Sequence, residues 1–130
     1  MNPKAVGEIS EGVVLGALLK QGKTVLMPFG NNQRYDLVID EDGTFVRAQV
    51  KTGRLRNGVI CFNTSSVNGF TGKRTVYDGQ ADVFLVYCPE TDGVYNIPVS
   101  ECGVSVTSLR VEPGKKDVSG SRWAKDYQIA

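Results

Sequence analysis

The sequence predicts an α+β (α/β) domain in which an N-terminal helix packs on a mixed β-sheet and a second β-hairpin completes the fold. Apolar residues recur at helical spacing over residues 3–20. Two Asp-Gly dipeptides, Asp42-Gly43 and Asp92-Gly93, each stand between short strand-like segments. At 130 residues the chain is long enough for one domain with a real core, and we expect a single domain over 1–130 with a docked tail from about 113 to 130.

The first element is an amphipathic helix from Pro3 to Lys20, ended by Gly22. Its polar side carries Glu8 and Glu11, which in the absence of other information are solvated surface residues. The apolar stripe expected to face the sheet consists of Val6, Ile9, Val13 and Ala17, widened by Leu15, Leu18 and Leu19.

The remaining elements are short strands separated by polar segments. Residues 83–87 are apolar at successive positions, which indicates a strand covered on both faces. Residues 52–58 read as a basic loop, and residues 63–80 as a long surface loop rich in Ser, Thr, Asn and Gly. Strands are expected at 24–28, 35–40, 44–51, 59–62, 83–87 and 94–99.

Composition excludes several classes of protein. The chain has no histidine, which rules out Ser/His and Cys/His triads, histidine-based nucleases and zinc sites that use histidine. Its 15 basic and 14 acidic residues give a net charge of +1, so any affinity for nucleic acid must come from local arrangement. The three cysteines form no Cys-x-x-Cys pair and are expected to be reduced and mostly buried. With no membrane-spanning stretch, we expect an intracellular protein of the cytoplasm.

The Asp42-Gly43 turn fixes which side chains meet across the first hairpin. A two-residue turn there pairs positions whose numbers add to 85, so Asp36 faces Gln49 with Cβ atoms about 4.5–5.5 Å apart. Lys51 joins the same face because side chains alternate along a strand. A solvated polar face would show the same alternation. The opposite face collects an apolar set, Tyr35, Leu37, Ile39, Val46, Ala48 and Val50.

These residues carry a resemblance. Asp36, then Gln49-Val50-Lys51 after a hairpin, behind a helix that bears glutamates, resembles the PD-(D/E)xK nuclease superfamily. The stretches PFGNNQRYDLVID, QVKTGRLRNG, FLVYCPETDGVYNIPV and RWAKDY are most similar to homing endonucleases of this type encoded in bacterial, notably cyanobacterial, group I introns. Tyr35 stands where the superfamily has proline, and Gln49 where it has an acidic residue, although the intron-encoded branch also has glutamine there.

The resemblance implies a restriction-endonuclease-like fold and a metal-dependent, sequence-specific double-strand DNA endonuclease of homing type, yielding 5′-phosphate and 3′-hydroxyl ends. Phosphodiester hydrolysis is served by a hard cation, Mg²⁺ or Mn²⁺, held by oxygen ligands. Asp36, the amide of Gln49 and the carbonyl of Val50 would supply them, and Lys51 would act on the attacking water. A second carboxylate is expected from Glu11, which precedes Gly22 at the spacing of the superfamily's helix glutamate, or alternatively from Glu8.

The expected partner is double-stranded DNA, bound by a homodimer or homotetramer because cutting both strands needs two active centres. The hairpin region is locally basic, with Arg47, Arg54 and Arg56 beside Lys51 and no acidic residue among them. Two alternatives remain, a Holliday-junction-type resolvase and a nuclease-like domain that only binds DNA. Further DNA contacts are expected from the long loop, at Asn63, Thr64, Ser65, Ser66, Lys73 and Arg74.

Overall fold

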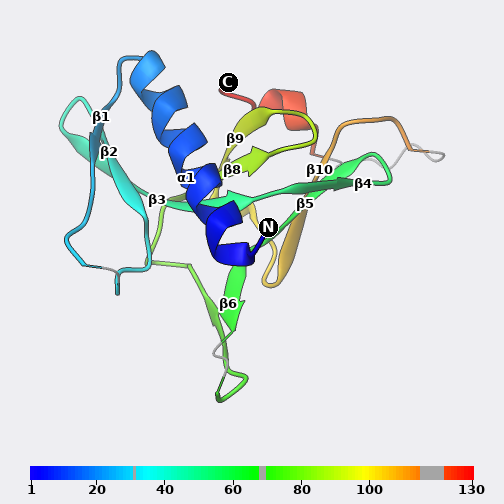
Figure 1. The fold of residues 1–130 in the computed structure, drawn as a ribbon, viewed down its shortest axis with the longest axis horizontal. Helices are drawn as coiled ribbons and strands as arrows, with labels where there is room; N and C mark the ends of the chain where they lie inside the picture. Colours follow the sequence, from blue (N-terminus) through cyan, green and yellow to red (C-terminus); the bar gives the residue numbers. More distant parts are fainter. Residues whose placement is uncertain (31, 68–69, 115–121) are drawn as a thin grey trace.

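The computed structural model describes residues 1–30, 32–67, 70–114 and 122–130. Its centre is a five-stranded sheet with the helix α1 (Pro3–Lys20) across one face (Figure 1). The pairing of β3 with β8 is parallel and the other pairings are antiparallel, which makes the sheet mixed, as predicted. In spatial order the strands are β1 (Thr24–Leu26), β2 (Leu37–Glu41), β3 (Thr44–Thr52), β8 (Val83–Cys88) and β9 (Gly93–Pro98).

Helix α1 begins and ends where the sequence predicts. The Asn2 side chain accepts a hydrogen bond from the N–H of Ala5 at 2.8 Å, and Gly22 adopts a φ of 76° just beyond the helix. The predicted apolar stripe is displaced, because Ile9 and Leu19 are 45% and 56% exposed. The residues that are buried against the sheet are Ser10, Val14 and Leu18.

The first hairpin has the predicted register. Asp42 and Gly43 have φ values of 52° and 92°, as a type I′ turn requires, and Leu37 pairs with Ala48. The expected strand over 35–40 is shorter at its start, since β2 begins at Leu37. The expected pair of Asp36 with Gln49 is therefore not part of the ladder, and Asp36 instead bonds the backbone of Ala48 and Val50. The apolar face of the hairpin packs under α1 in a core cluster that includes Leu37, Ile39, Ala48 and Val50. Tyr35, which the sequence predicts on this face, packs against the other core cluster, because the strand has not yet begun at that position.

The prediction of a basic loop over 52–58 is wrong, because most of this segment belongs to a hairpin that the sequence analysis did not predict. Strand β4 (Arg54–Arg56) pairs with β5 (Val59–Asn63) through a turn at Asn57-Gly58, where both residues have positive φ. This dipeptide is a hairpin signal that the sequence reading missed. Strand β10 (Val106–Arg110), also not anticipated, pairs with β5 to complete a three-stranded sheet.

The expected surface loop over 63–80 is also wrong in part. Strand β6 (Ser65–Val67) pairs antiparallel with β7 (Arg74–Val76), and the resulting ribbon projects away from the body of the molecule (Figure 1). Residues 68–69 of that segment lie outside the described part of the chain. Short strands without an apolar face give no periodic signal, which is why they read as loop.

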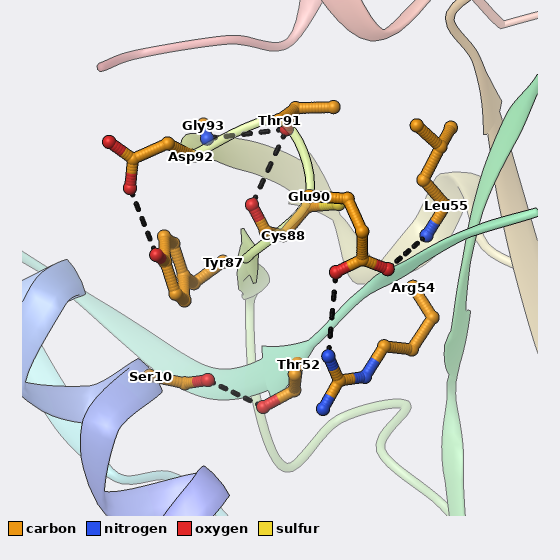
Figure 2. A network of polar contacts seen from close by, with 10 residues as sticks. All are labelled: Ser10, Thr52, Arg54, Leu55, Tyr87, Cys88, Glu90, Thr91, Asp92 and Gly93. Atoms are coloured by element: carbon orange, nitrogen blue, oxygen red, sulfur yellow. Dashed lines mark hydrogen bonds and ion pairs between the residues drawn. The ribbon is translucent and has the colours of Figure 1, made fainter.

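The second predicted hairpin forms, but its turn is longer than expected. Cys88 pairs with Gly93, so the connection is the four residues 89–92 and Gly93 belongs to β9. The Thr91 hydroxyl donates to the Cys88 carbonyl and accepts from the N–H of Gly93, which closes the longer turn (Figure 2). The prediction that residues 83–87 form a strand covered on both faces is confirmed by the burial of β8.

The chain end lies against the body. Beyond the short helix η1 (Val99–Glu101) and β10, Trp123 bridges to Arg110 and Gln128 bridges to Tyr95, on either side of the short helix η2 (Ala124–Asp126). Residues 115–121 of the expected tail are outside the described residues. The three cysteines are free thiols. Across the described ranges, no helix is long and apolar enough to cross a membrane.

Candidate metal and phosphodiester site

Asp36 directly precedes β2, which begins at Leu37. Beyond Ala48, the edge of β3 that faces β2 is therefore not paired with a strand. The N–H of Asp36 donates to the carbonyl of Ala48, and its Oδ2 accepts from the N–H of Val50, both at 2.8 Å. Because the N–H and C=O of one residue point to the same edge of a strand, the Val50 carbonyl oxygen lies at this edge too. The carboxylate of Asp36 and a backbone oxygen are thus brought together in place of strand pairing.

Glu11 reaches the same place from α1. It is half-buried and lines a pocket of about 200 Å³ together with Asp36. Burial raises the pKa of Glu11, and the negative charge of Asp36 and a hydrogen bond with its side chain raise it further. Glu8 is exposed and acts on the Glu11 pKa only through its charge, as the last of these causes. Of the two helix glutamates, the structure therefore places Glu11 beside Asp36.

A buried polar contact holds α1 in this position. The hydroxyl groups of Ser10 and Thr52 are 2.5 Å apart, and Figure 2 shows them joining the helix to the end of β3. Ser10 is only 1% exposed. Since Ser10 precedes Glu11 and Thr52 follows Lys51, this contact fixes how the helix glutamate lies relative to the strand that carries the lysine.

Gln49 and Lys51 alternate with the residues buried under α1, so their side chains lie on the other face of the sheet. The Lys51 ammonium donates to the Tyr77 hydroxyl at 3.3 Å, and the Gln49 amide nitrogen lies 3.5 Å from the Val50 carbonyl oxygen. That amide contact is at the limit of a hydrogen bond. Exchanging the amide oxygen and nitrogen of Gln49 would direct its oxygen to the same edge as Val50.

The donor set fits a hard divalent cation. Among the described residues there is no group of three or more histidine, cysteine or acidic side chains that could hold a metal ion by itself. A metal at this edge would therefore be held by the two carboxylates of Glu11 and Asp36, with neutral oxygens from Val50 and Gln49. Oxygen-only ligands of this kind suit Mg²⁺ or Mn²⁺ and not zinc.

The predicted basic residues differ in whether an acidic side chain already pairs with them. Arg47 donates to the Asp82 carboxylate through Nε and Nη2, at 3.1 and 3.0 Å, and also donates to the Gly79 carbonyl. The Arg54 guanidinium lies 3.4 Å from the Glu90 carboxylate, and Figure 2 shows this ion pair. Arg56 is exposed on β4 and has no ion pair among the described residues.

The residues predicted to contact DNA from the loop lie on or beside the β6–β7 ribbon. Ser65 accepts from Arg74 at 2.8 Å, and Ser66 accepts from Arg34 at 2.7 Å. Lys73 is exposed and directly precedes β7. Asn63 is exposed at the end of β5, and Thr64 is buried, where it donates to the Gly103 carbonyl.

A larger pocket, of about 560 Å³, lies elsewhere and is lined by Arg110 and Arg122 among others. Both guanidinium groups already donate to backbone carbonyls, of Glu112 and Glu101 respectively. A divalent metal needs carboxylate ligands, and the pair Glu11 and Asp36 lines the smaller pocket, which favours that pocket as the metal site.

Sequence reasoning missed three residues around the site, namely Arg34, Tyr77 and Asp82. Arg34 stands within the quoted stretch PFGNNQRYDLVID, two positions before Asp36. Tyr77 and Asp82 follow the ribbon and gave no signal, because their partners Lys51 and Arg47 are 26 and 35 residues away in the sequence.

Comparison with known proteins shows the family of the chain. A family model described as PD-(D/E)XK endonuclease matches residues 1–130. The solved structure of a bacterial homing endonuclease, I-Ssp6803I, is similar with a TM-score of 0.78 and 26% identity, covering 98% of this chain and 89% of that one. No curated protein sequence matches the chain. The fold is thus the restriction-endonuclease-like α+β fold expected from the sequence, and the chain belongs to the PD-(D/E)XK endonuclease family, whose members generally use divalent metal ions to cut DNA.

Proposed function

We propose that this endonuclease is a Mg²⁺- or Mn²⁺-dependent, sequence-specific enzyme of homing type that cuts both strands of DNA and leaves 5′-phosphate and 3′-hydroxyl ends. The observation that carries the proposal is the pair of adjacent carboxylates, Glu11 and Asp36, at the free edge of β3. The homing type is supported by the similarity to I-Ssp6803I over 98% of the chain.

The metal ligands in this proposal are the carboxylates of Asp36 and Glu11, the amide oxygen of Gln49 and the carbonyl oxygen of Val50. A bound divalent ion supplies charge neutralisation at the phosphate and a more acidic water. Glu8, which is exposed, remains the alternative helix carboxylate. The raised pKa of Glu11 supports this assignment, because two carboxylates without a cation between them are destabilised by their own repulsion.

Lys51 acts on the attacking water. As an ammonium group it orients the water toward the phosphorus and stabilises the negative charge that builds up on the phosphoryl oxygens, whereas removal of the water's proton requires its neutral amine form. The lysine is held on the face of β3 opposite α1, so it approaches the scissile phosphate from a different side than Glu11 does.

DNA is bound by the basic residues around this edge and by the β6–β7 ribbon. A two-stranded ribbon has the dimensions to enter the major groove, where base edges are read. Arg47 keeps its structural partner Asp82, so we assign it no phosphate. The proposed contacts are Arg54, Arg56, Lys73 and Arg74 to phosphates, and Asn63 and Ser66 to bases or backbone. Ser65 is buried and accepts from Arg74, so we assign it the role of holding that arginine.

The proposed assembly is a homodimer or homotetramer. Each chain offers one carboxylate pair and one projecting ribbon among its described residues. Cutting two strands therefore needs two copies, and two-fold symmetry places both on a pseudo-palindromic target.

Cleavage of supercoiled plasmid carrying a selected target tests this function. The wild type should linearise it in Mg²⁺ or Mn²⁺ and only bind it in Ca²⁺, whereas Lys51→Ala should bind without cutting. The exposed Lys125→Ala serves as the matched control and should cut like the wild type.

Three outcomes contradict the proposal. Binding in Ca²⁺ with no cleavage in Mg²⁺ or Mn²⁺ would identify a DNA-binding module. Preference for a cruciform over linear DNA would identify a junction resolvase. Undiminished cleavage by Lys51→Ala would remove the lysine from the chemistry. A footprint on randomised DNA gives the length and symmetry of the target and hence the number of subunits.

A further inference from the structure

Lys51 is held by an aromatic residue that sequence reasoning did not identify. Its Nζ atom donates to the Tyr77 hydroxyl at 3.3 Å and lies 4.8 Å from the centre of the Tyr77 ring. The Arg34 guanidinium carbon lies 4.0 Å from the same ring centre. One tyrosine ring therefore contacts two cations, each within the range of a cation–π interaction.

Tyr77 is itself rigidly placed. It is 5% exposed and packs edge-on against Phe84, with ring centres 5.4 Å apart and an interplanar angle of 85°. Its carbonyl accepts from the N–H groups of Gln80 and Ala81, which closes the turn leading to β8. The Tyr77 ring is thus fixed by its packing in the core and by the hydrogen bonds of its backbone. A ring in a fixed position can restrict the flexible side chain of Lys51 that contacts it.

Arg34 connects the Tyr77 ring to the β6–β7 ribbon and to the segment that carries Asp36. Its side chain donates to the Ser66 hydroxyl at 2.7 Å and to the carbonyls of Thr75 and Val76, on the two strands of the ribbon. In sequence it stands two positions before Asp36. The same side chain therefore connects the base of the β6–β7 ribbon with the segment that carries the proposed metal ligand.

We infer that Tyr77 is the positioning residue of Lys51, and that Arg34 holds the Tyr77 ring in a fixed position relative to the β6–β7 ribbon. The inference rests on the proposed function, in which Lys51 acts on the attacking water. A lysine side chain has four rotatable bonds, so its ammonium group samples several positions unless a contact restricts it. Displacing a reacting group by about 1 Å can lower the reaction rate by about 100-fold. Tyr77 restricts the ammonium without touching substrate.

Two substitutions separate the contributions of the ring and the hydroxyl. Tyr77→Phe keeps the ring and should lower the single-turnover cleavage rate by about 3- to 10-fold, whereas Tyr77→Leu removes both contacts and should lower it by about 100-fold. The dissociation constant for target DNA in Ca²⁺ should change less than about twofold in either variant, because Lys51 keeps its charge.

Tyr95→Phe is the matched control. Tyr95 is 2% exposed in the same core cluster as Tyr77, and its hydroxyl is 2.9 Å from that of Thr91 in the turn before β9. The substitution thus removes one buried hydroxyl contact and should affect stability as Tyr77→Phe does, while the cleavage rate stays at the wild-type value.

A spectroscopic readout tests the contact without reference to activity. The ring current of Tyr77 should shift the ε-methylene protons of Lys51 upfield in the metal-free protein. The shift should persist in Tyr77→Phe and disappear in Tyr77→Leu. Comparable spectra in all three proteins would overturn the inference.

The kinetic outcomes distinguish this inference from the function on which it rests. If Lys51→Ala is inactive and Tyr77→Leu cuts like Tyr95→Phe, the positioning role alone is overturned. If Lys51→Ala cuts at the wild-type rate, the proposed role of Lys51 is overturned and the inference with it. Should Tyr77→Leu fail to fold, Tyr77→Phe decides, since an unchanged rate there contradicts the role.

Discussion

Glu11 on α1 and Glu90 in the turn after β8 are glutamates on the same small protein, but their surroundings move their pKa values in opposite directions. The pKa of Glu90 is lowered, first by the hydrogen bond from the N–H of Leu55 and then by Arg54 (Figure 2). The pKa of Glu11 is raised by burial and by the neighbouring charge of Asp36. One carboxylate has donors and a cation around it, and the other has a second carboxylate.

This contrast distinguishes acidic residues that have structural partners from those proposed to bind a metal. Asp82 belongs with Glu90, because the side-chain hydrogen bond from Arg47 holds its pKa below the usual value. Glu11 and Asp36 form no ion pair with any residue that the structure describes. A protein gains no stability from such a pair of like charges, and a glutamate whose pKa is raised beside a second carboxylate is typical of a functional site. The missing partner in our account is a divalent cation.

The largest expected difference between the two regions is in catalysis. Asp36→Asn should lower the cleavage rate by about 1,000-fold, since it removes a charged ligand. Asp82→Asn, the same chemical change at a structural carboxylate, should leave the rate within about twofold. Single-turnover cleavage at saturating Mg²⁺ measures both, and equal losses would erase the distinction between the two aspartates.

Gln49→Ala should have an intermediate effect, confined to cleavage. Removing a neutral ligand is expected to lower the cleavage rate at fixed Mg²⁺ by about 10- to 100-fold while DNA affinity in Ca²⁺ is nearly unchanged. Cleavage measured against Mg²⁺ concentration checks this, because added metal should restore part of the activity. Equal loss of binding and cleavage would contradict the assignment of Gln49 as a ligand.

Matched substitutions of the two glutamates should change stability in opposite directions when metal is removed by EDTA. A carboxylate with a raised pKa costs stability once ionised, so Glu11→Gln should raise the Tm at pH 7. A carboxylate with a lowered pKa gives stability above its unfolded-state pKa, so Glu90→Gln should lower the Tm at pH 7.

The pH dependence of these differences follows from the same shifts. The penalty at Glu11 should vanish as the pH falls below its unfolded value near 4.5. The stabilisation at Glu90 should be lost as the pH falls through its lowered pKa. Thermal melts between neutral and acidic pH measure both, and Tm changes of the same sign at pH 7 would break the comparison.

The smallest effect is expected in the salt dependence of DNA binding. Arg56→Ala should reduce the slope of log affinity against log salt by about 1, because its charge has no partner among the described residues. Arg54→Ala should reduce it by less, since Glu90 already offsets that charge. Binding titrations in Ca²⁺ at several salt concentrations provide the slopes, and unchanged slopes would remove both arginines from the phosphate contacts.

The sequence predicts those parts of the fold that follow from local rules. The Asp42-Gly43 dipeptide defines the first turn, and the apolar run of β8 identifies a buried strand. The ladder from that turn ends at Leu37, so the surroundings of Asp36 depend on hydrogen bonds to Ala48 and Val50 that no dipeptide encodes. The sequence reading also overlooked Asn57-Gly58, although its local signal was as clear as that of Asp42-Gly43.

Contacts between distant segments set the rest of the site. The hydrogen bond of Ser10 with Thr52 joins residues 42 positions apart and fixes the helix beside β3. Tyr77 meets Lys51 only because the chain returns from the ribbon to β8. Neither contact leaves a periodic or compositional trace, since each depends on how complete elements pack and not on what lies next to them in the sequence.

Direct binding of Mn²⁺ to the protein in the absence of DNA tests the central claim, that Glu11 and Asp36 hold a divalent ion. Electron paramagnetic resonance of free Mn²⁺ should show a site in the wild type that is lost in Asp36→Asn, weakened in Glu11→Gln and unchanged in Glu90→Gln. Equal Mn²⁺ binding by the wild type and Asp36→Asn would contradict the account.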